Sequence, residues 1–263
     1  MKTRFLSSLA MLPLLLVLYY GGYPLMIACF LVGFFGVREF YKGFETLDIH
    51  ANHWVALIAI VSLYAIHLLQ SFDAFKQTDW MMFWFFGVIL LSLLTLFQIE
   101  KRKLEDALVT ITGIFYVIYF SFHVQLIASI QLKFIWLVFL TAFGTDIMAY
   151  FSGYLFGKHK LCPKISPKKT IEGAIGGTLG SIILCGLFGY FILPQFMVHC
   201  MVIGALGGVV SQFGDLTASI FKRKMGIKDY GNLIPGHGGI MDRFDSVLFT
   251  APMVYYYIIL VLK

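Results

Sequence analysis

Acidic side chains occur where the sequence is otherwise apolar or rich in glycine. Asp146 and Asp215 lie inside long apolar runs, and Asp242 and Asp245 lie three residues apart just before the last run. A carboxylate inside an apolar run is costly unless it faces a bundle interior or a water-filled cavity, so these residues are functional candidates. If Asp242 and Asp245 lie on one helical turn, they share a face and can meet Asp215 across the bundle. Carboxylate oxygens from two segments suit Mg²⁺.

Basic side chains surround the C-terminal carboxylates. The same stretch carries Lys222, Arg223, Lys228 and Arg243. Such cations bind phosphate oxygens and offset the charge that develops on a transferring phosphoryl group. Mg²⁺ usually keeps several waters and takes one or two protein carboxylates together with phosphate oxygens, so this sparse set of acids indicates a phosphorylated substrate.

A polar stripe leads from the middle of one long apolar run toward its charged end. Ser211, Asp215, Ser219 and Lys222 recur at helical spacing, with Gln212 three residues before the aspartate. Two explanations stay open. Asp215 and Lys222 are seven residues apart and can neutralise each other within the bundle, or Asp215 can belong to a site that it shares with Asp242.

His237 lies in a glycine-rich loop, with glycine at positions 236, 238 and 239. Glycine lets the backbone take conformations closed to other residues. His237 can therefore contact a base or a phosphate, or it can shape a turn. The other histidines show no spacing typical of metal ligands and fit positions at the membrane interface.

The polar segment 166–173 lies between two apolar runs. Thr170 is suited to cap the helix that follows, and Ser166, Lys168 and Lys169 precede it. Anions bind at the positive N-terminal end of a helix, so the segment is a candidate for a second set of contacts to a triphosphate. The alternative is a surface anchor with a helix cap. Two G-x-x-x-G spacings follow and predict close helix packing: Gly173, Gly176, Gly177 and Gly180.

The elements that must position these residues are membrane helices. Of the 263 residues, 59% are hydrophobic and 13% are charged, against roughly 25% charged in soluble domains. The sequence predicts an all-α, polytopic integral membrane protein with about nine transmembrane helices. The apolar runs are 5–20, 23–41, 53–70, 80–99, 106–122, 133–156, 171–193, 197–221 and 246–262. We expect one integral domain over 1–263, with anchoring and lipid-side spans in 1–130 and catalytic spans and loops in 131–263.

Charge distribution predicts how the chain is oriented. The first run follows Lys2 and Arg4 but lacks the cleavage site of a signal peptide, so it is taken as a span. With the N-terminus inside, all basic residues except Lys76, Lys133 and Lys263 fall on the cytoplasmic side, as the positive-inside rule requires. The site is therefore expected to face the cytoplasm from the cell membrane.

Two other readings of the composition are set aside. The net charge is +6, but the basic residues lie in short loops between apolar runs, where topology and anionic headgroups account for them without nucleic acid. The four cysteines show no metal-binding spacing and are expected to be small buried hydrophobes.

The C-terminal pattern resembles a known family signature. Ser219-x-x-Lys222-Arg223, then Lys228-Asp229, and then Pro235-x-His237-Gly238-Gly239-x-x-Asp242-Arg243-x-Asp245 look like the signature of the phosphatidate cytidylyltransferases. The segments 146–150, 166–173 and 212–216 also look like family motifs. The resemblance covers the C-terminal half, because the N-terminal spans match only in hydropathy and length.

The resemblance implies an enzyme that joins CTP to phosphatidic acid and releases pyrophosphate and CDP-diacylglycerol. It implies Mg²⁺, leaves a second cation open, and makes a homodimer the expected state. It implies catalytic roles for Asp215, Lys222, Asp242, Arg243 and Asp245, with Asp215 and Asp242 as metal ligands. It implies substrate-binding roles for Ser166, Lys168, Lys169, Thr170, Ser219, Arg223, Lys228, Asp229 and His237. The role of Asp146 stays ambiguous.

Two alternative functions are compatible with the sequence. The family is similar to CTP-dependent polyprenol kinases and other lipid cytidylyltransferases, which change the acceptor or transfer the γ-phosphate. A cation-coupled transporter is the alternative from another class, because intramembrane aspartates can bind a coupling ion. Its weakness is that few acids lie near the outer face to complete a path.

Overall fold

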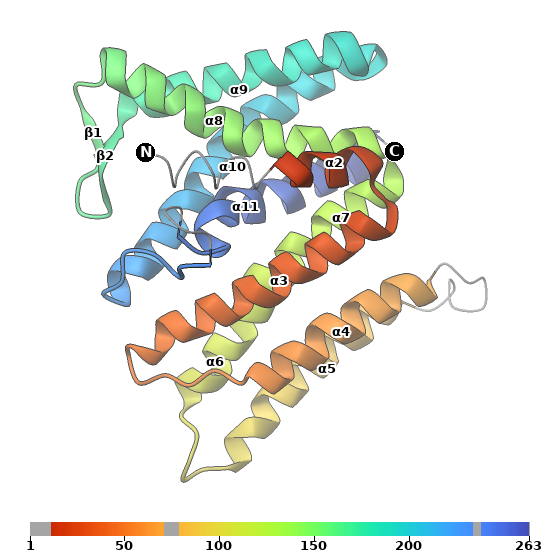
Figure 1. Ribbon diagram of the computed structural model, residues 1–263, viewed down its shortest axis with the longest axis vertical. Helices are drawn as coiled ribbons and strands as arrows, with labels where there is room; N and C mark the ends of the chain where they lie inside the picture. The colour runs from red at the N-terminus through yellow and green to blue at the C-terminus, as the bar shows by residue number, and fades with distance from the viewer. Residues whose placement is uncertain (1–11, 71–78, 234–237, 263) are drawn as a thin grey trace.

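Long helices that run back and forth make up most of the protein (Figure 1). The computed structural model describes residues 12–70, 79–233 and 238–262. The helices are α2 (Leu12–Tyr20), α3 (Gly22–Glu45), α4 (His53–Leu69), α5 (Trp80–Leu94), α6 (Leu104–Gly113), α7 (Phe120–Ile130), α8 (Ile135–Phe156), α9 (Ile171–Ile192), α10 (Met197–Lys224) and α11 (Met241–Tyr257). Short 3₁₀ or π-helical segments extend several of them: Thr95–Phe97, Ile114–Tyr119, Leu132–Phe134, Pro194–Phe196 and Ile258–Leu262.

The expected all-α, polytopic architecture is confirmed. Among the described residues, seven segments are long and apolar enough to cross a membrane, namely 22–45, 80–97, 104–130, 132–156, 171–192, 194–224 and 241–262. The run 53–70 forms the shorter apolar helix α4, and of the run 5–20 the structure describes α2. The count of nine spans therefore stays a prediction.

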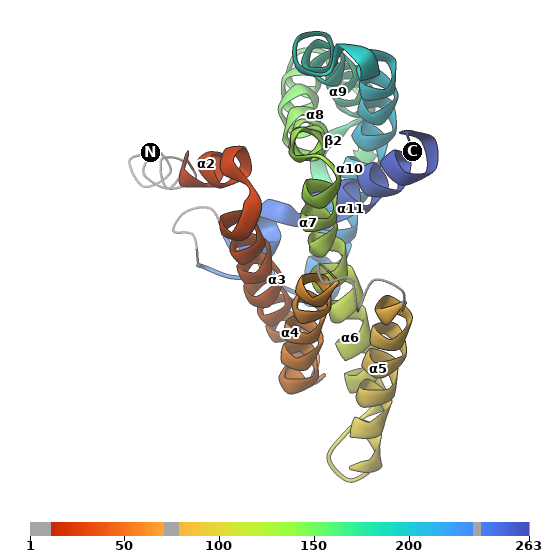
Figure 2. The same ribbon diagram turned by 90° about the vertical axis from the view of Figure 1, so that its right-hand side faces the viewer.

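The helices form two sides with a layer between them (Figures 1 and 2). In both views α8 and α9 lie on one side, α4, α5 and α6 lie on the other, and α3, α7 and α11 run between them. Buried aromatic side chains such as Phe40, Tyr41 and Phe122 fill the core of this middle layer. The Tyr41 hydroxyl donates to the Thr110 carbonyl oxygen at 2.7 Å and so joins α3 to α6.

Glycines bring α8, α9 and α10 close together, as the sequence predicts. A Cβ at Gly177 would lie 2.9 Å from the Thr145 carbonyl oxygen of α8, and one at Gly180 would lie 2.4 Å from Met148 Cγ. On the other face of α9, a Cβ at Gly208 of α10 would lie 3.0 Å from Thr178 Cα. These contacts leave no room for larger side chains, so the glycines of α9 serve packing.

A small hairpin projects from the joint of α8 and α9 (Figure 1). Strands β1 (Lys160–Cys162) and β2 (Ser166–Thr170) pair antiparallel, with Lys160 opposite Thr170. The sequence predicted a polar segment here but no strands. Its predicted helix cap is confirmed, because Thr170 Oγ1 accepts a hydrogen bond from Gly173 N at 3.1 Å.

The last helix begins earlier than its apolar run. The run was placed at 246–262, whereas α11 begins at Met241, so Asp242, Arg243 and Asp245 lie on its first turns. Asp242 and Asp245 thus lie on one helix, as expected, but of the two only Asp245 is found to interact with Asp215 among the described contacts.

Candidate active site

A cavity of about 520 Å³ opens between the hairpin and helices α8, α9 and α10. Its walls carry polar side chains from α8, the hairpin and α10, whereas α9 contributes Gly173 and Ala174. The polar residues are Asp146, Tyr150, Tyr154, Lys160, Ser166, Lys168, Lys169, Thr170, Gln212 and Asp215. The predicted segment 166–173 and the predicted acids Asp146 and Asp215 therefore face one space. This arrangement sets lysines on a projecting hairpin opposite carboxylates held by helices.

Lys169 and Asp215 form an ion pair across this cavity. Both side chains are about one quarter exposed, at 26% and 24%. Ser219 Oγ lies 3.5 Å from Asp215 Oδ1, one turn along α10. The proposed mutual neutralisation of Asp215 and Lys222 is wrong, because each of them pairs with a residue of another element.

Three carboxylates from three helices lie within electrostatic range of one another. Asp215 of α10 interacts with Asp146 of α8 and with Asp245 of α11, and Asp146 and Asp245 also interact with each other. Close packing causes this approach, because a Cβ at Gly214 would lie 2.8 Å from the Asp245 carbonyl oxygen. Asp245 is buried, and its Oδ1 accepts from Ser246 N at 2.8 Å. The centre of the site therefore gathers three carboxyl groups from three helices.

Asp242 has different surroundings although it is only one turn from Asp245. Its Oδ1 accepts from Lys222 Nζ at 2.8 Å, and its Oδ2 accepts from Tyr230 N at 2.8 Å and from Gly239 N at 3.0 Å. Its side chain is only 5% exposed. Both carboxylate oxygens of Asp242 thus accept hydrogen bonds from within the protein. These bonds hold the loop between α10 and α11 against the start of α11.

The same loop is shaped by two further features. Gly238 has a φ of 83°, and a Cβ at this position would lie 2.9 Å from Asp242 Oδ2. Only glycine takes this backbone conformation readily. The Tyr230 hydroxyl donates to the Ala218 carbonyl oxygen at 3.2 Å, and burial raises the pKa of Tyr230, which keeps the hydroxyl a donor. The conformation of this loop therefore depends on Gly238 and on the buried side chain of Tyr230.

Glu39 of α3, which is not among the predicted site residues, reaches the same loop. Its Oε2 accepts from Met241 N, at the start of α11, at 2.9 Å. A Cβ at Gly239 would lie 2.3 Å from Glu39 Oε2, and one at Gly231 would lie 2.6 Å from its Oε1. An acid at a helix N-terminus satisfies a free N–H group and complements the helix dipole. The signal was present, because Glu39 is an acid inside the apolar run 23–41.

The remaining predicted residues differ in their placement. Lys168 is exposed at the cavity wall, while Arg223 Nε donates to the Ile165 carbonyl oxygen at 3.3 Å and joins α10 to the hairpin. Arg243 is half-buried on the first turn of α11. Lys228 and Asp229 are exposed on the α10–α11 loop, away from the cavity wall. His237 lies outside the described residues.

The carboxylates fit a cation that shares its coordination with a ligand. Within the described part of the chain, no three His, Cys, Asp or Glu residues are grouped closely enough to enclose a metal by themselves. Asp146, Asp215 and Asp245 nevertheless repel one another, and Lys169 is the direct ion-pair partner of only one of them. Such a site suits Mg²⁺ bound partly by phosphate oxygens.

Comparison with known proteins identifies the family. The model of the cytidylyltransferase family matches residues 2–261. The chain belongs to the cytidylyltransferase family. Similar members include the phosphatidate cytidylyltransferases of Staphylococcus epidermidis, 34% identical over 97% of both chains, and of Bacillus subtilis, 32% identical over 97% of both chains. The enzyme of that name from Synechocystis is 48% identical over 48% of this chain and 43% of its own length.

Proposed function

We propose that the protein transfers the cytidylyl group of CTP to phosphatidic acid, yielding CDP-diacylglycerol and pyrophosphate. The observation that carries the proposal is the cavity in which hairpin lysines face a concentration of carboxylates. Membership in the cytidylyltransferase family supports the nucleotide, and the similar proteins named phosphatidate cytidylyltransferase support the lipid. The reaction places the chain in phospholipid biosynthesis.

The hairpin side of the cavity is the proposed site of the triphosphate. Lys160, Lys168 and Lys169 line it, and the capped N-terminus of α9 adjoins them. Lysine ammonium groups attract phosphate oxygens and stabilise the charge that builds on a departing pyrophosphate. Lys169 would exchange its contact with Asp215 for one with CTP, which frees Asp215 at the moment of binding.

The reaction needs alignment more than activation. A phosphatidate oxygen attacks the α-phosphorus of CTP, the bond from that phosphorus to the β-phosphate bridge breaks, and pyrophosphate leaves. The nucleophile is already anionic, so no general base and no covalent enzyme intermediate are required. Catalysis then depends on holding two anions in line and neutralising their charge.

A divalent cation, Mg²⁺, would supply the charge neutralisation that brings these two anions together. Asp215 is the proposed ligand from α10. Asp245 and Asp146 already interact with Asp215, whereas Asp242 would first have to release Lys222 and two backbone amides. This difference favours Asp245 or Asp146 as the second carboxylate and gives Asp242 the role of positioning Lys222 and the loop.

An apolar groove of about 490 Å³ adjoins the polar cavity and is the proposed site of an acyl chain. The two spaces share Leu161, Ala174 and Gln212 in their walls. Gln212 Nε2 donates to the Ala174 carbonyl oxygen and to Thr178 Oγ1, both at 3.1 Å, and is thereby fixed at the junction. A polar space that continues into an apolar one matches a phosphorylated lipid whose chains remain in the bilayer.

The orientation and assembly belong to the same proposal. The hairpin, the ends of α3, α8 and α10, and the start of α11 lie at one end of the bundle, at the left in Figure 1. The basic clusters at this end favour the cytoplasmic side of the cell membrane, where CTP is available. A homodimer is proposed from the family resemblance alone.

The deciding experiment measures pyrophosphate released by the purified protein in mixed micelles with CTP and Mg²⁺. Release that requires added phosphatidic acid, with CDP-diacylglycerol formed in equal amount, is the expected result. Release of CDP with a phosphorylated lipid would instead identify a kinase. Folded protein that forms neither product would overturn the proposal, and cation flux without CTP would favour a transporter.

A further inference from the structure

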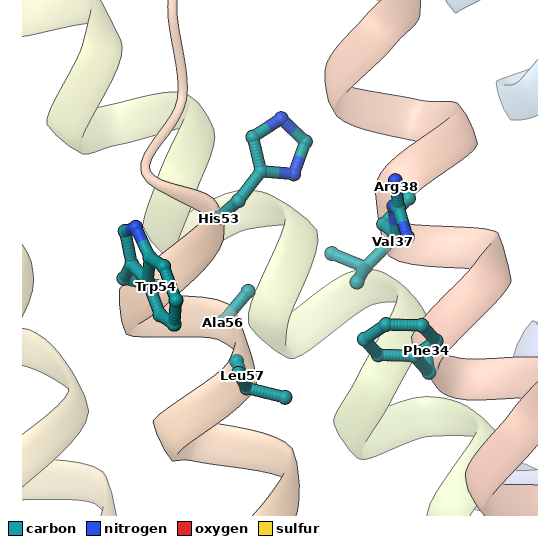
Figure 3. A pocket seen from close by; sticks show the side chains of 7 residues that line it. All are labelled: Phe34, Val37, Arg38, His53, Trp54, Ala56 and Leu57. Atoms are coloured by element: carbon teal, nitrogen blue, oxygen red, sulfur yellow. The ribbon is translucent and has the colours of Figure 1, made fainter.

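A second cavity, separate from the carboxylates, lies between α3 and α4 (Figure 3). It has about 220 Å³ and is lined by Phe34, Val37, Arg38, His53, Trp54, Ala56 and Leu57. None of these residues lines the cavity around Asp215. The N-terminal half of the chain therefore has a cavity of its own, apart from the one that contains Asp215.

Arg38 holds an unusual position at this cavity. Its guanidinium carbon lies 5.5 Å from the ring centroid of Phe34, one helical turn earlier. Within the described ranges no carboxylate forms an ion pair with it. Arg38 is exposed, and the cation–π contact orients its guanidinium over the Phe34 ring at the edge of the cavity. A permanent cation at an apolar hollow is suited to an anion that brings apolar groups with it.

The surrounding charges leave the rim of the cavity positive. Arg38 and Arg102 both lie within electrostatic range of His53. The acid in this group is Glu45, whose Oε1 is 4.0 Å from His53 Nε2. Two arginines and one carboxylate therefore lie within electrostatic range of His53, which leaves an excess of positive charge. Lys42, one turn beyond Arg38, is exposed and adds to the positive field.

The floor of the cavity is apolar and its edge is aromatic. Figure 3 shows Phe34, Val37 and Arg38 of α3 facing His53, Ala56 and Leu57 of α4. Val37 and Ala56 are buried, whereas Trp54 is 74% exposed at the first turn of α4. Tryptophan favours the boundary between headgroups and hydrocarbon, because its ring is apolar and its N–H is polar. The cavity is thus positioned where lipid phosphates lie.

We infer that this cavity binds one anionic phospholipid, with its phosphate against Arg38 and the first part of an acyl chain against Val37, Ala56 and Leu57. An inorganic phosphate would leave the apolar floor uncovered, and a zwitterionic lipid would gain less from the positive rim. The inference rests on α3 and α4 and does not depend on the proposed reaction. The bound lipid would hold these two helices together at the membrane surface.

The test is native mass spectrometry of the full chain released from non-ionic detergent, titrated with phosphatidylglycerol or phosphatidylcholine. We expect one phosphatidylglycerol per chain to be retained preferentially, and roughly tenfold weaker retention in Arg38→Gln, since a charge-assisted contact is lost. Lys101→Gln removes the same charge from an exposed position outside the cavity, and it should bind as the wild type does.

A second variant and a competitor separate the alternatives. Leu57→Ser keeps the rim and removes part of the floor, so it should also weaken phosphatidylglycerol binding, while glycerol 3-phosphate should not displace the lipid. Equal retention of the two lipids, or phosphatidylglycerol binding that survives both Arg38→Gln and Leu57→Ser, would overturn the inference. Full displacement by glycerol 3-phosphate would do the same, because it would show a free phosphate site.

Discussion

Asp215 and Asp242 are both aspartates, but different surroundings give their side chains different roles. Asp215 meets a lysine at the edge of an open cavity and repels two other carboxylates, so a ligand can change its partners. Asp242 is enclosed by Lys222 and two backbone amides. Sequence alone gave them one role, since it shows which acids are present and not which donors surround each of them.

Asparagine substitutions should separate these two roles. Asp215→Asn is expected to abolish turnover and leave the melting temperature near that of the wild type, because its side chain faces the cavity. Asp242→Asn leaves Lys222 with only 14% exposure and no counterion, so a loss of roughly 3 kcal/mol in the free energy of unfolding should accompany lost activity. Turnover and denaturation of both purified variants give the answer. Normal turnover in Asp215→Asn would refute its role as a ligand.

Lys169 should affect CTP more than the chemical step. Lys169→Gln removes a cation that lines the proposed triphosphate site, so the KM for CTP should rise roughly tenfold with a smaller change in kcat. Lys164→Gln alters an exposed lysine in the turn of the same hairpin and is the matched control. An unchanged KM in Lys169→Gln would show that the hairpin lysines only anchor the loop.

At the scale of elements, apolar runs predicted the existence and order of most helices. The glycine spacing of α9 predicted its close packing, and Thr170 predicted the start of α9. Two features escaped because they depend on distant contacts. Strands β1 and β2 pair mainly with each other in a lysine-rich segment of low strand propensity. The early start of α11 is stabilised by Glu39, which hydropathy places in another span.

The contact between α3 and α11 makes Glu39 a positioning residue. Glu39→Ala removes the acceptor for Met241 N, and kcat should fall roughly tenfold or more with little change in the KM for CTP. Glu39→Gln should restore most of the rate, because an amide oxygen also accepts that hydrogen bond. Glu45→Ala, an exposed acid farther along α3, is the control. A Glu39→Gln variant as slow as Glu39→Ala would show that the charge itself is needed.

At the scale of the whole molecule, the site occupies one end of the bundle. The hairpin carries Cys162, which is half-buried, whereas Cys29, Cys185 and Cys200 are buried. Lys133 is exposed between α7 and α8, at the other end of α8 from the hairpin. These two positions therefore report on opposite faces of the membrane.

Thiol labelling of intact spheroplasts should establish the orientation. A membrane-impermeant maleimide is expected to spare Cys162 until the membrane is permeabilised, because positively charged segments stay in the cytoplasm. Lys133→Cys in a Cys162→Ser background should show the reverse, and Cys162→Ser alone measures the background. Labelling of Cys162 in intact cells would place the site on the outside.

The hydrogen bond from Met241 to Glu39 joins residues 202 positions apart. At a synthesis rate of roughly 5 to 20 residues per second, Glu39 waits about 10 to 40 s on the ribosome before its partner exists. During that interval Glu39 lacks the N–H group from which it accepts in the folded protein. A chain interrupted before α11 would leave this acceptor without that partner. The last helix to be synthesised thus both completes the site and satisfies an acid on one of the first.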